Sequence, residues 1–81
     1  MKRFDLRLDG KFLFDAEEIA ADPVLGLASR MSGVKDDGVI EFSAASVEEA
    51  AEKILGEFIY SPGGGARSLC GRYEIVPEKK W

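Results

Sequence analysis

The feature that most constrains the fold is a wide apolar stripe with helical spacing between residues 47 and 59. Apolar side chains recur there at intervals of three and four, the period of an α-helix with one buried face. The members of the stripe are Val47, Ala50, Ala51, Ile54, Leu55, Phe58 and Ile59. Ser46 and Glu49 have the spacing of a capping box directly before it. The pattern predicts a helix over residues 47–59, anchored on an apolar layer by Leu55 and Phe58.

The start of the chain has the strict alternation of a half-buried strand over residues 3–8. A second strand is predicted over residues 11–14, after the turn signal Asp9-Gly10. A two-residue loop would put both phenylalanines of that second strand on the face opposite the apolar side of the first. We therefore expect a three-residue loop over residues 8–10, with Gly10 left-handed in a bulge.

A helical stretch and two further strands complete the predicted elements. Residues 16–32 are predicted to be helical, capped by Asp15 and broken near Pro23. Alternation predicts strands over residues 39–43 and 69–75. The order ββαβαβ predicts one α+β domain spanning residues 1–81, with two layers: a four-stranded mixed or antiparallel sheet and two helices on one of its faces. The other face is expected to be polar, and the pattern leaves the strand order and the oligomeric state open.

Composition places the chain among small folded proteins. Of its 81 residues, 46% are hydrophobic and 32% are charged, which argues against disorder. We expect no targeting segment, because the first ten residues carry alternating charges, and no membrane span, because no apolar run approaches about 20 residues. A single cysteine, Cys70, excludes an internal disulfide, so a cytoplasmic location is expected.

Residues 61–73, SPGGGARSLCGRY, raise the question of a phosphate-binding loop. Phosphate loops run from a strand through glycines into a helix, whose N-terminus holds the anion. Here the glycines leave a predicted helix and enter a predicted strand, and the Lys-Ser/Thr pair of a Walker loop is missing. The loop is predicted to be a mobile hinge or a partner contact that tolerates loss of one glycine. Weak anion binding by its amides remains the alternative. The residues concerned are Gly63, Gly64, Gly65 and Arg67.

The residue inventory argues against catalysis. The chain has no histidine and one cysteine, which removes Ser-His and Cys-His nucleophilic pairs and the usual zinc ligand sets. Paired carboxylates such as Glu48-Glu49 fall at predicted helix starts and in a turn, where capping and the helix dipole account for them. We expect a protein that is not an enzyme and that has no metal site and no cofactor.

Direct nucleic-acid binding is a second possible function. The exposed sheet face would present Arg3, Arg7 and Arg72, diluted by Asp5 and Glu74. A sheet that stacks bases also needs aromatic residues on its open face, and the pattern assigns the strand aromatics to the inner one. An accessory protein or complex subunit with this basic face is the alternative to a protein-binding function, and we consider direct nucleic-acid binding the less favoured of the two.

Charge is unevenly distributed along the chain. Eleven acids against three bases give residues 12–59 a charge of −8, within a chain whose net charge is −4. An acidic helical layer of this kind can steer a basic partner. On a helical wheel, the outer side of the helix predicted over residues 47–59 carries Glu49, Glu52, Lys53 and Gly56, and with Glu48 these are the predicted partner-binding residues. A glycine there costs about 1 kcal/mol relative to alanine, so Gly56 reflects either neutral drift or close approach by a partner.

The strand-helix unit GVIEFSAASVEEAAEKILGEF, residues 38–58, resembles the build of many small phage-encoded proteins, including anti-CRISPR inhibitors. Such inhibitors are typically tiny, often acidic and without catalytic residues. The resemblance covers about a quarter of the chain and transfers no functional residue. It implies an acidic inhibitor that blocks a larger nucleic-acid-handling complex by contact, with a protein partner that has a basic surface.

Overall fold

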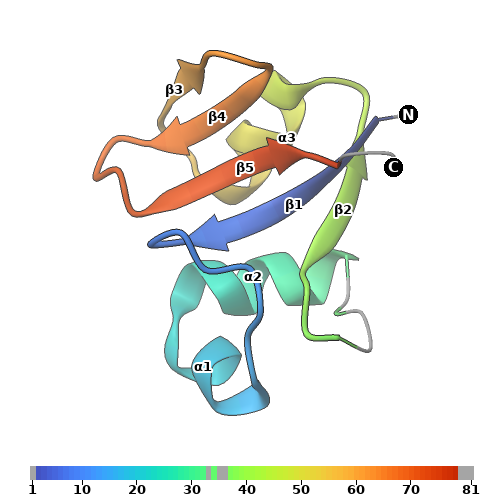
Figure 1. Ribbon diagram of the computed structural model, residues 1–81, viewed down its shortest axis with the longest axis vertical. Coiled ribbons are helices and arrows are strands. Elements are labelled where there is room, and N and C mark those ends of the chain that lie inside the picture. Colours follow the sequence, from blue (N-terminus) through green and yellow to red (C-terminus); the bar gives the residue numbers. More distant parts are fainter. Residues whose placement is uncertain (1, 33, 35–36, 79–81) are drawn as a thin grey trace.

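A five-stranded antiparallel sheet forms the centre of the fold, in a computed structural model that describes residues 2–32, 34 and 37–78. Its strands are β1 (Lys2–Leu8), β2 (Glu41–Ala44), β3 (Phe58–Ser61), β4 (Gly65–Ser68) and β5 (Tyr73–Pro77). The helices are α1 (Ala16–Ala21), α2 (Pro23–Ser32) and α3 (Val47–Ile54). Across the sheet the strands follow the order β2-β1-β5-β4-β3 (Figure 1). The predicted α+β class is confirmed, whereas the described residues form five strands and three helices instead of four and two.

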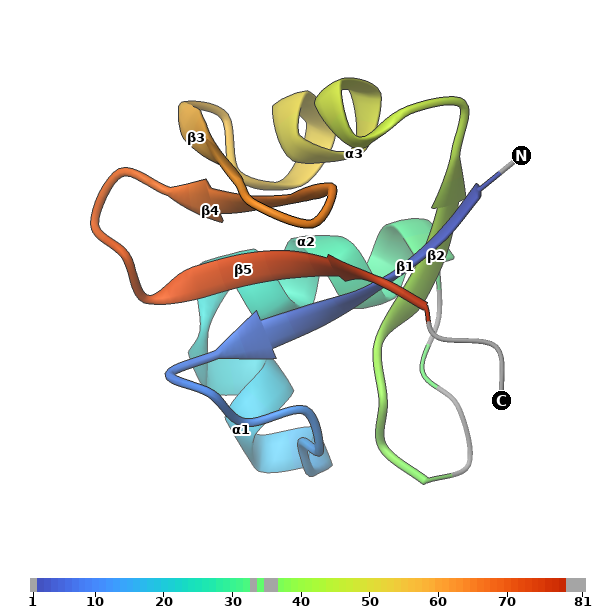
Figure 2. The ribbon, with the colours of Figure 1, turned by 45° about the horizontal axis from the view of Figure 1, so that its top comes forward.

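One face of the sheet is apolar and carries the core. Phe4 of β1 lies opposite Phe42 of β2, and Leu6 lies opposite Ile75 of β5. Residues paired in this way point to the same side of an antiparallel sheet, and all four of these side chains are buried. Helix α3 packs on β2, β4 and β5, and α2 packs on β2. Figure 2 shows both helices on the same side of the sheet.

The predicted helix starts are confirmed. The Asp15 carboxylate accepts a hydrogen bond of 2.8 Å from the N–H of Glu18, whose side chain accepts one from the N–H of Asp15. Asp22 accepts a bond of 2.9 Å from the N–H of Val24 and so caps α2. With Pro23 in the first helical position, the stretch divides there into α1 and α2, as the sequence predicts.

The predicted three-residue loop after the first strand is wrong. Leu8 and Lys11 exchange two backbone hydrogen bonds, of 3.0 and 2.9 Å, around the two-residue turn Asp9-Gly10. Both turn residues have positive φ, 51° and 82°. Positive φ at both positions is the mark of a type I′ turn, the two-residue loop whose twist suits a hairpin. Pairing stops after this single bridge, so no strand forms over residues 11–14.

The short turn separates two phenylalanines that the sequence pattern places on one face. Phe12 lies against the guanidinium group of Arg7, whose carbon is 4.4 Å from the ring centre. Phe14 is buried in the core instead. Leu13 makes an isolated bridge to Val39, so this segment runs beside the approach to β2.

The predicted helix over residues 47–59 is too long. Helix α3 ends at Ile54 with Leu55 as its C-cap. Gly56 follows with φ 73°, the left-handed conformation that glycine adopts after a helix C-terminus. Its N–H donates to the carbonyl of Ala51 at 3.1 Å. The last two members of the predicted stripe therefore leave the helix and begin β3.

The bounds of the final predicted strand, residues 69–75, also differ from those in the structure. Residues 65–68 form β4, residues 69–72 turn, and β5 continues to Pro77. The strand predicted over residues 39–43 is found as β2, which begins two residues later and ends one residue later, with isolated bridges at its approach. Strands β3, β4 and β5 therefore form an antiparallel meander that leaves β3 at one edge of the sheet and β2 at the other.

Candidate functional site

The outer side of α3 carries the first group of predicted partner-binding residues. Ser46 caps the helix by accepting a 3.2 Å hydrogen bond from the N–H of Glu49. The core-facing side is buried through Ala50, Ala51 and Ile54. Glu48 and Glu52 are exposed on the opposite side. Among the described residues neither of these two carboxylates has an ion-pair partner, so they form a row of uncompensated negative charge along α3.

Two other predicted members of this group, Glu49 and Lys53, form an ion pair with each other within α3. The Glu49 carboxylate accepts bonds of 3.0 Å from Nζ of Lys53 and 3.2 Å from the N–H of Ala45. These two bonds and the charge of Lys53 lower the pKa of Glu49 below its ordinary value. Glu49 is thus a capping residue and one half of an i,i+4 ion pair, which leaves Lys53 largely compensated. We therefore reduce the candidate row to Glu48 and Glu52.

Gly56 does not lie within the helix as predicted. It occupies the left-handed position after the C-cap, and a Cβ placed on it would meet no atom within 4 Å. Its backbone conformation accounts for the glycine without a partner. The inference that a partner approaches the helix closely at Gly56 therefore loses its basis.

The glycine loop forms the turn between β3 and β4 and does not act as one unit. Gly63 and Gly64 are exposed and have positive φ, 96° and 91°. Gly65 is buried in β4, where an added Cβ would lie 2.6 Å from the carbonyl oxygen of Ile75. Arg67 pairs across the strands with Glu74, on the sheet face away from the core. The predicted set of three glycines and Arg67 is thus divided among the turn, the strand interior and the outer face.

An open groove of about 850 Å³ brings parts of the two predicted sites together. The start of β1, the start of α3, the glycine turn and the end of β5 all line it. Its charged lining includes Lys2, Glu48 and Glu78, and its turn side consists of Gly63 and Gly64. Residues from four parts of the sequence meet here because β1 lies beside β5 and α3 crosses the sheet. Glu48 therefore borders the exposed backbone of the glycine turn.

The arginines of the proposed basic face are each paired with a carboxylate. Arg3 lies 3.5 Å from Glu41 of β2, and Arg7 lies 3.0 Å from Glu74 of β5. Arg72 is not on the sheet face: it lies in the turn before β5 and pairs with Asp9 at 3.3 Å. The face away from the core is consequently a pattern of alternating charges.

Three carboxylates gather on this same face. Oxygens of Asp5, Glu41 and Glu78, all partly buried, lie within 4.8 Å of one another. Carboxylate oxygens are ligands for Ca²⁺ and Mg²⁺, so these are the described residues that could hold such an ion. The ion pair between Arg3 and Glu41 gives a second account of the cluster, and proximity alone does not select a metal. The sequence did not indicate the cluster, because its members lie in β1, in β2 and just after β5, and the order of these strands was open.

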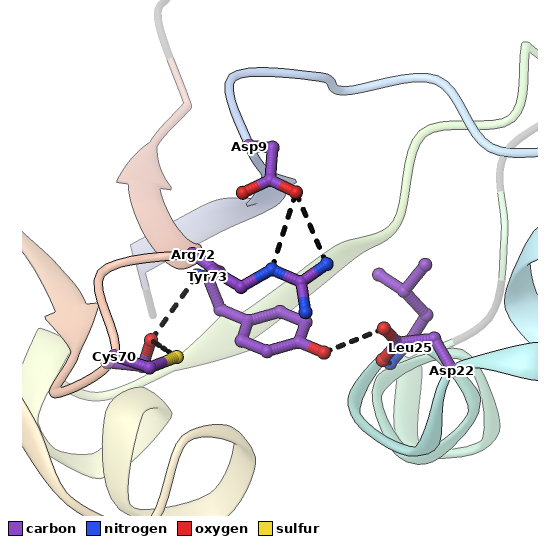
Figure 3. Close-up of polar contacts among 7 residues, drawn as sticks. Asp9, Asp22, Leu25, Cys70, Arg72 and Tyr73 are labelled. Carbon is purple, nitrogen blue, oxygen red and sulfur yellow. Dashed lines mark hydrogen bonds and ion pairs between the residues drawn. The ribbon is translucent and has the colours of Figure 1, made fainter.

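A polar network ties the turn before β5 to the junction of α1 and α2 (Figure 3). The Tyr73 hydroxyl donates a 2.6 Å hydrogen bond to the Asp22 carboxylate. Burial, this bond and the negative charge of Asp22 raise the pKa of Tyr73 to about 12. Burial alone would raise the pKa of Asp22, but the Tyr73 hydroxyl, two backbone N–H groups and Arg72 together lower it. The network connects β5 to the helical layer.

Cys70 lies beside this network and is exposed and free. Its sulfur is 3.2 Å from the Ser68 hydroxyl. That contact, the N–H of Arg72 and the nearby guanidinium lower the pKa of the thiol. A lowered pKa is one of the ways in which a cysteine is activated as a nucleophile, but a lone exposed cysteine does not by itself define a catalytic site.

Helices in the described part of the chain are all too short, or not apolar enough, to cross a bilayer. Comparison of the chain with protein-family models, with curated proteins and with solved structures found no match.

Proposed function

We propose that the protein is a non-enzymatic, cytoplasmic binding domain that acts by contact on a protein partner with a basic surface. The observation that carries this proposal is the uncompensated pair of acids on α3. Glu48 and Glu52 are exposed and make no ion pair among the described residues, whereas Arg3, Arg7 and Arg72 each have a carboxylate partner. Attraction toward a partner comes from charge that is not already neutralised.

The same comparison argues against the alternative of direct nucleic-acid binding. A nucleic-acid site needs cations that can exchange counterions for phosphates. Each arginine of the supposed basic face would first have to leave its carboxylate, and Asp5, Glu41 and Glu74 would repel the phosphates. Phe12 is the aromatic ring that lies over Arg7, and one ring does not make a stacking platform.

The inhibitor role follows from the resemblance of residues 38–58 to small phage-encoded proteins and from the position of the acidic row. An exposed helix that carries acids can occupy a basic channel which otherwise binds nucleic acid. The adjacent groove, with the bare backbone of Gly63 and Gly64 on one wall, gives a partner side chain access beside Glu48. The target in this proposal is a larger nucleic-acid-handling complex.

Affinity purification from the native host, followed by mass spectrometry, tests the proposal. Glu48→Lys combined with Glu52→Lys should abolish capture of a basic protein complex that the wild-type chain retains. Glu17→Lys is a matched control, because Glu17 is exposed in the first turn of α1 as Glu48 is in that of α3. Its effect on the helix dipole should equal that of Glu48→Lys alone, and it should leave capture intact.

Two outcomes contradict this function. Equal capture by the double variant and the wild type would place the interface elsewhere. Salt-sensitive retention of the chain on a polyanionic resin, lost on Arg3→Ala or Arg7→Ala, would favour the nucleic-acid alternative.

A further inference from the structure

Strand β3 is an edge strand that is open and apolar on both faces. In the described chain it pairs with β4 alone, and it ends the strand order. Ile59 lies opposite Arg67 on the charged face and is 49% exposed. Tyr60 lies opposite Ala66 on the core face and is 50% exposed. Helix α3 covers β4 and β5 and leaves this edge of the core layer open.

Strand β3 itself has neither a charge nor a proline, although it is only four residues long and Glu57 and Pro62 flank it. Monomeric proteins protect such edges with charged side chains, prolines, bulges or a covering segment. The opposite edge, β2, begins with Glu41, and residues just before it are bridged to Val34 and Leu13.

We propose that β3 pairs with β3 of a second copy of this chain, antiparallel and about a two-fold axis, joining two sheets of five strands into one of ten. Faces are conserved across such a pair only if residues of the same parity are opposite each other. Placing Ile59 opposite Ile59 of the other copy meets this condition. Phe58 then lies opposite Tyr60 of the other copy, twice, on the core face. Phe58 and Tyr60 already contact each other edge to face, with ring centres 5.7 Å apart, so four aromatic rings would form one cluster.

The charges near the edge are compatible with this register. Glu57 precedes β3, and each Glu57 would lie opposite Ser61 of the other copy. The two Glu57 residues are then about 13 Å apart along the strands, which exceeds the Debye length of about 8 Å at physiological ionic strength. Arg67, beside Ile59, comes about 12 Å from Glu57 of the other copy by the same strand spacings, which is also beyond the Debye length, so this pair adds little attraction. No like charges face each other, so a second copy fits the edge although the chain is acidic overall.

Sedimentation equilibrium of the whole chain, over a wide range of concentration up to the millimolar, tests the dimer. The wild type should show a reversible monomer–dimer equilibrium. Ile59→Lys would place two cations opposite each other and should raise the dimer dissociation constant about tenfold or more. Leu13→Lys is the matched control: Leu13 is 53% exposed and far from β3 in the chain, and its replacement should leave the constant unchanged. A wild-type chain that stays monomeric at every concentration, or an unchanged constant for Ile59→Lys, overturns the proposal.

Disulfide trapping tests the register. Cys70 is exposed and free, so the experiment uses a Cys70→Ser background. Directly opposed residues in an antiparallel pair have Cα atoms about 4.5–5.5 Å apart, which a disulfide can span. Ile59→Cys should therefore give a covalent dimer on oxidation, and Tyr60→Cys, which faces Phe58 of the other copy, should give much less. The reverse order of yields would refute this register.

The dimer and the proposed partner binding can fail separately. A dimeric chain with no basic partner leaves the edge proposal intact and removes the function proposed above. A monomeric chain whose partner capture is abolished by Ile59→Lys would mean that the edge receives a strand from the partner, and the dimer proposal would then be wrong.

Discussion

Replacing Gly56 by alanine separates the helix that the sequence pattern predicts from the helix that the structure contains. If Gly56 lay inside a helix, as the apolar stripe over residues 47–59 suggests, alanine would stabilise the protein by about 1 kcal/mol. In the structure Gly56 follows the C-cap with φ 73°. Holding alanine in the left-handed conformation costs about 1–2 kcal/mol. The two descriptions of α3 therefore predict changes of opposite sign.

The size of the effect follows from the surroundings of Gly56. An added Cβ would meet no atom within 4 Å, so backbone strain is the one unfavourable contribution. For a domain of 60–100 residues, 1 kcal/mol shifts Tm by about 4–8 °C. We expect Gly56→Ala to lower Tm by about 5–15 °C, a large part of the stability of so small a domain.

Thermal unfolding followed by circular dichroism measures this shift, with two controls. Gly26 lies inside α2 and has no positive φ, and an added Cβ would lie 3.4 Å from the carbonyl oxygen of Ile19, an ordinary contact. Gly26→Ala should therefore leave Tm unchanged or raise it. Gly56→Asn should lower Tm less than Gly56→Ala, because asparagine tolerates the left-handed conformation. A Gly56→Ala variant that melts above the wild type would refute the helix end described here.

Three further predictions follow from contacts in the sheet and its network. Gly65→Ala should lower the free energy of unfolding by about 2–3 kcal/mol in urea titrations, because its Cβ would lie 2.6 Å from the Ile75 carbonyl oxygen; wild-type stability would show that β4 and β5 are not in this contact. Phe58→Ala should cost about 1–2 kcal/mol, less than the 3–5 kcal/mol typical of a buried phenylalanine, because its ring is only partly buried at the sheet edge; a larger loss would return Phe58 to the core. Tyr73→Phe should cost about 1–2 kcal/mol by removing the bond to Asp22. Because the pKa of Tyr73 is raised from 10.0 to about 12, its contribution should be complete below pH 10.0 and lost as the pH rises through 12, so the stabilities of variant and wild type should converge there; a difference independent of pH would contradict this account.

Local signals in the sequence predicted the local features of the fold. The two caps at Asp15 and Asp22 depend on residues within one helical turn, so spacing alone was sufficient to predict them. The alternation of residues 3–8 likewise predicted which side of β1 is buried. These features require no knowledge of which strand lies beside which.

The predictions failed where one local pattern is compatible with two structures. Residues 54, 55, 58 and 59 continue a helical stripe, but Phe58 and Ile59 are also strong strand formers. The conformation of Gly56 decides between the longer helix and the helix that ends before a strand. The sequence does not reveal that conformation, because a glycine inside a helix and a glycine after its C-cap look the same in sequence. The loop at Asp9-Gly10 has the same ambiguity: apolar parity favoured three residues, whereas the turn chemistry favoured two. Turn chemistry prevailed, and Phe14 is buried in the core without a second strand over residues 11–14.

The candidate site could be predicted only in part, because its charges acquire meaning from the strand order. Alternation correctly placed Arg3, Arg7 and Asp5 on one side of β1, which by itself suggested a basic face. The sheet then sets β2 on one flank of β1 and β5 on the other, bringing Glu41 to Arg3 and Glu74 to Arg7. Neither acid is near its arginine in the sequence, so the neutralisation of this face is a property of the tertiary structure. The acids of α3 have no such neighbouring strand on their outer side, and for that reason Glu48 and Glu52 keep the negative charge on which the proposed function depends.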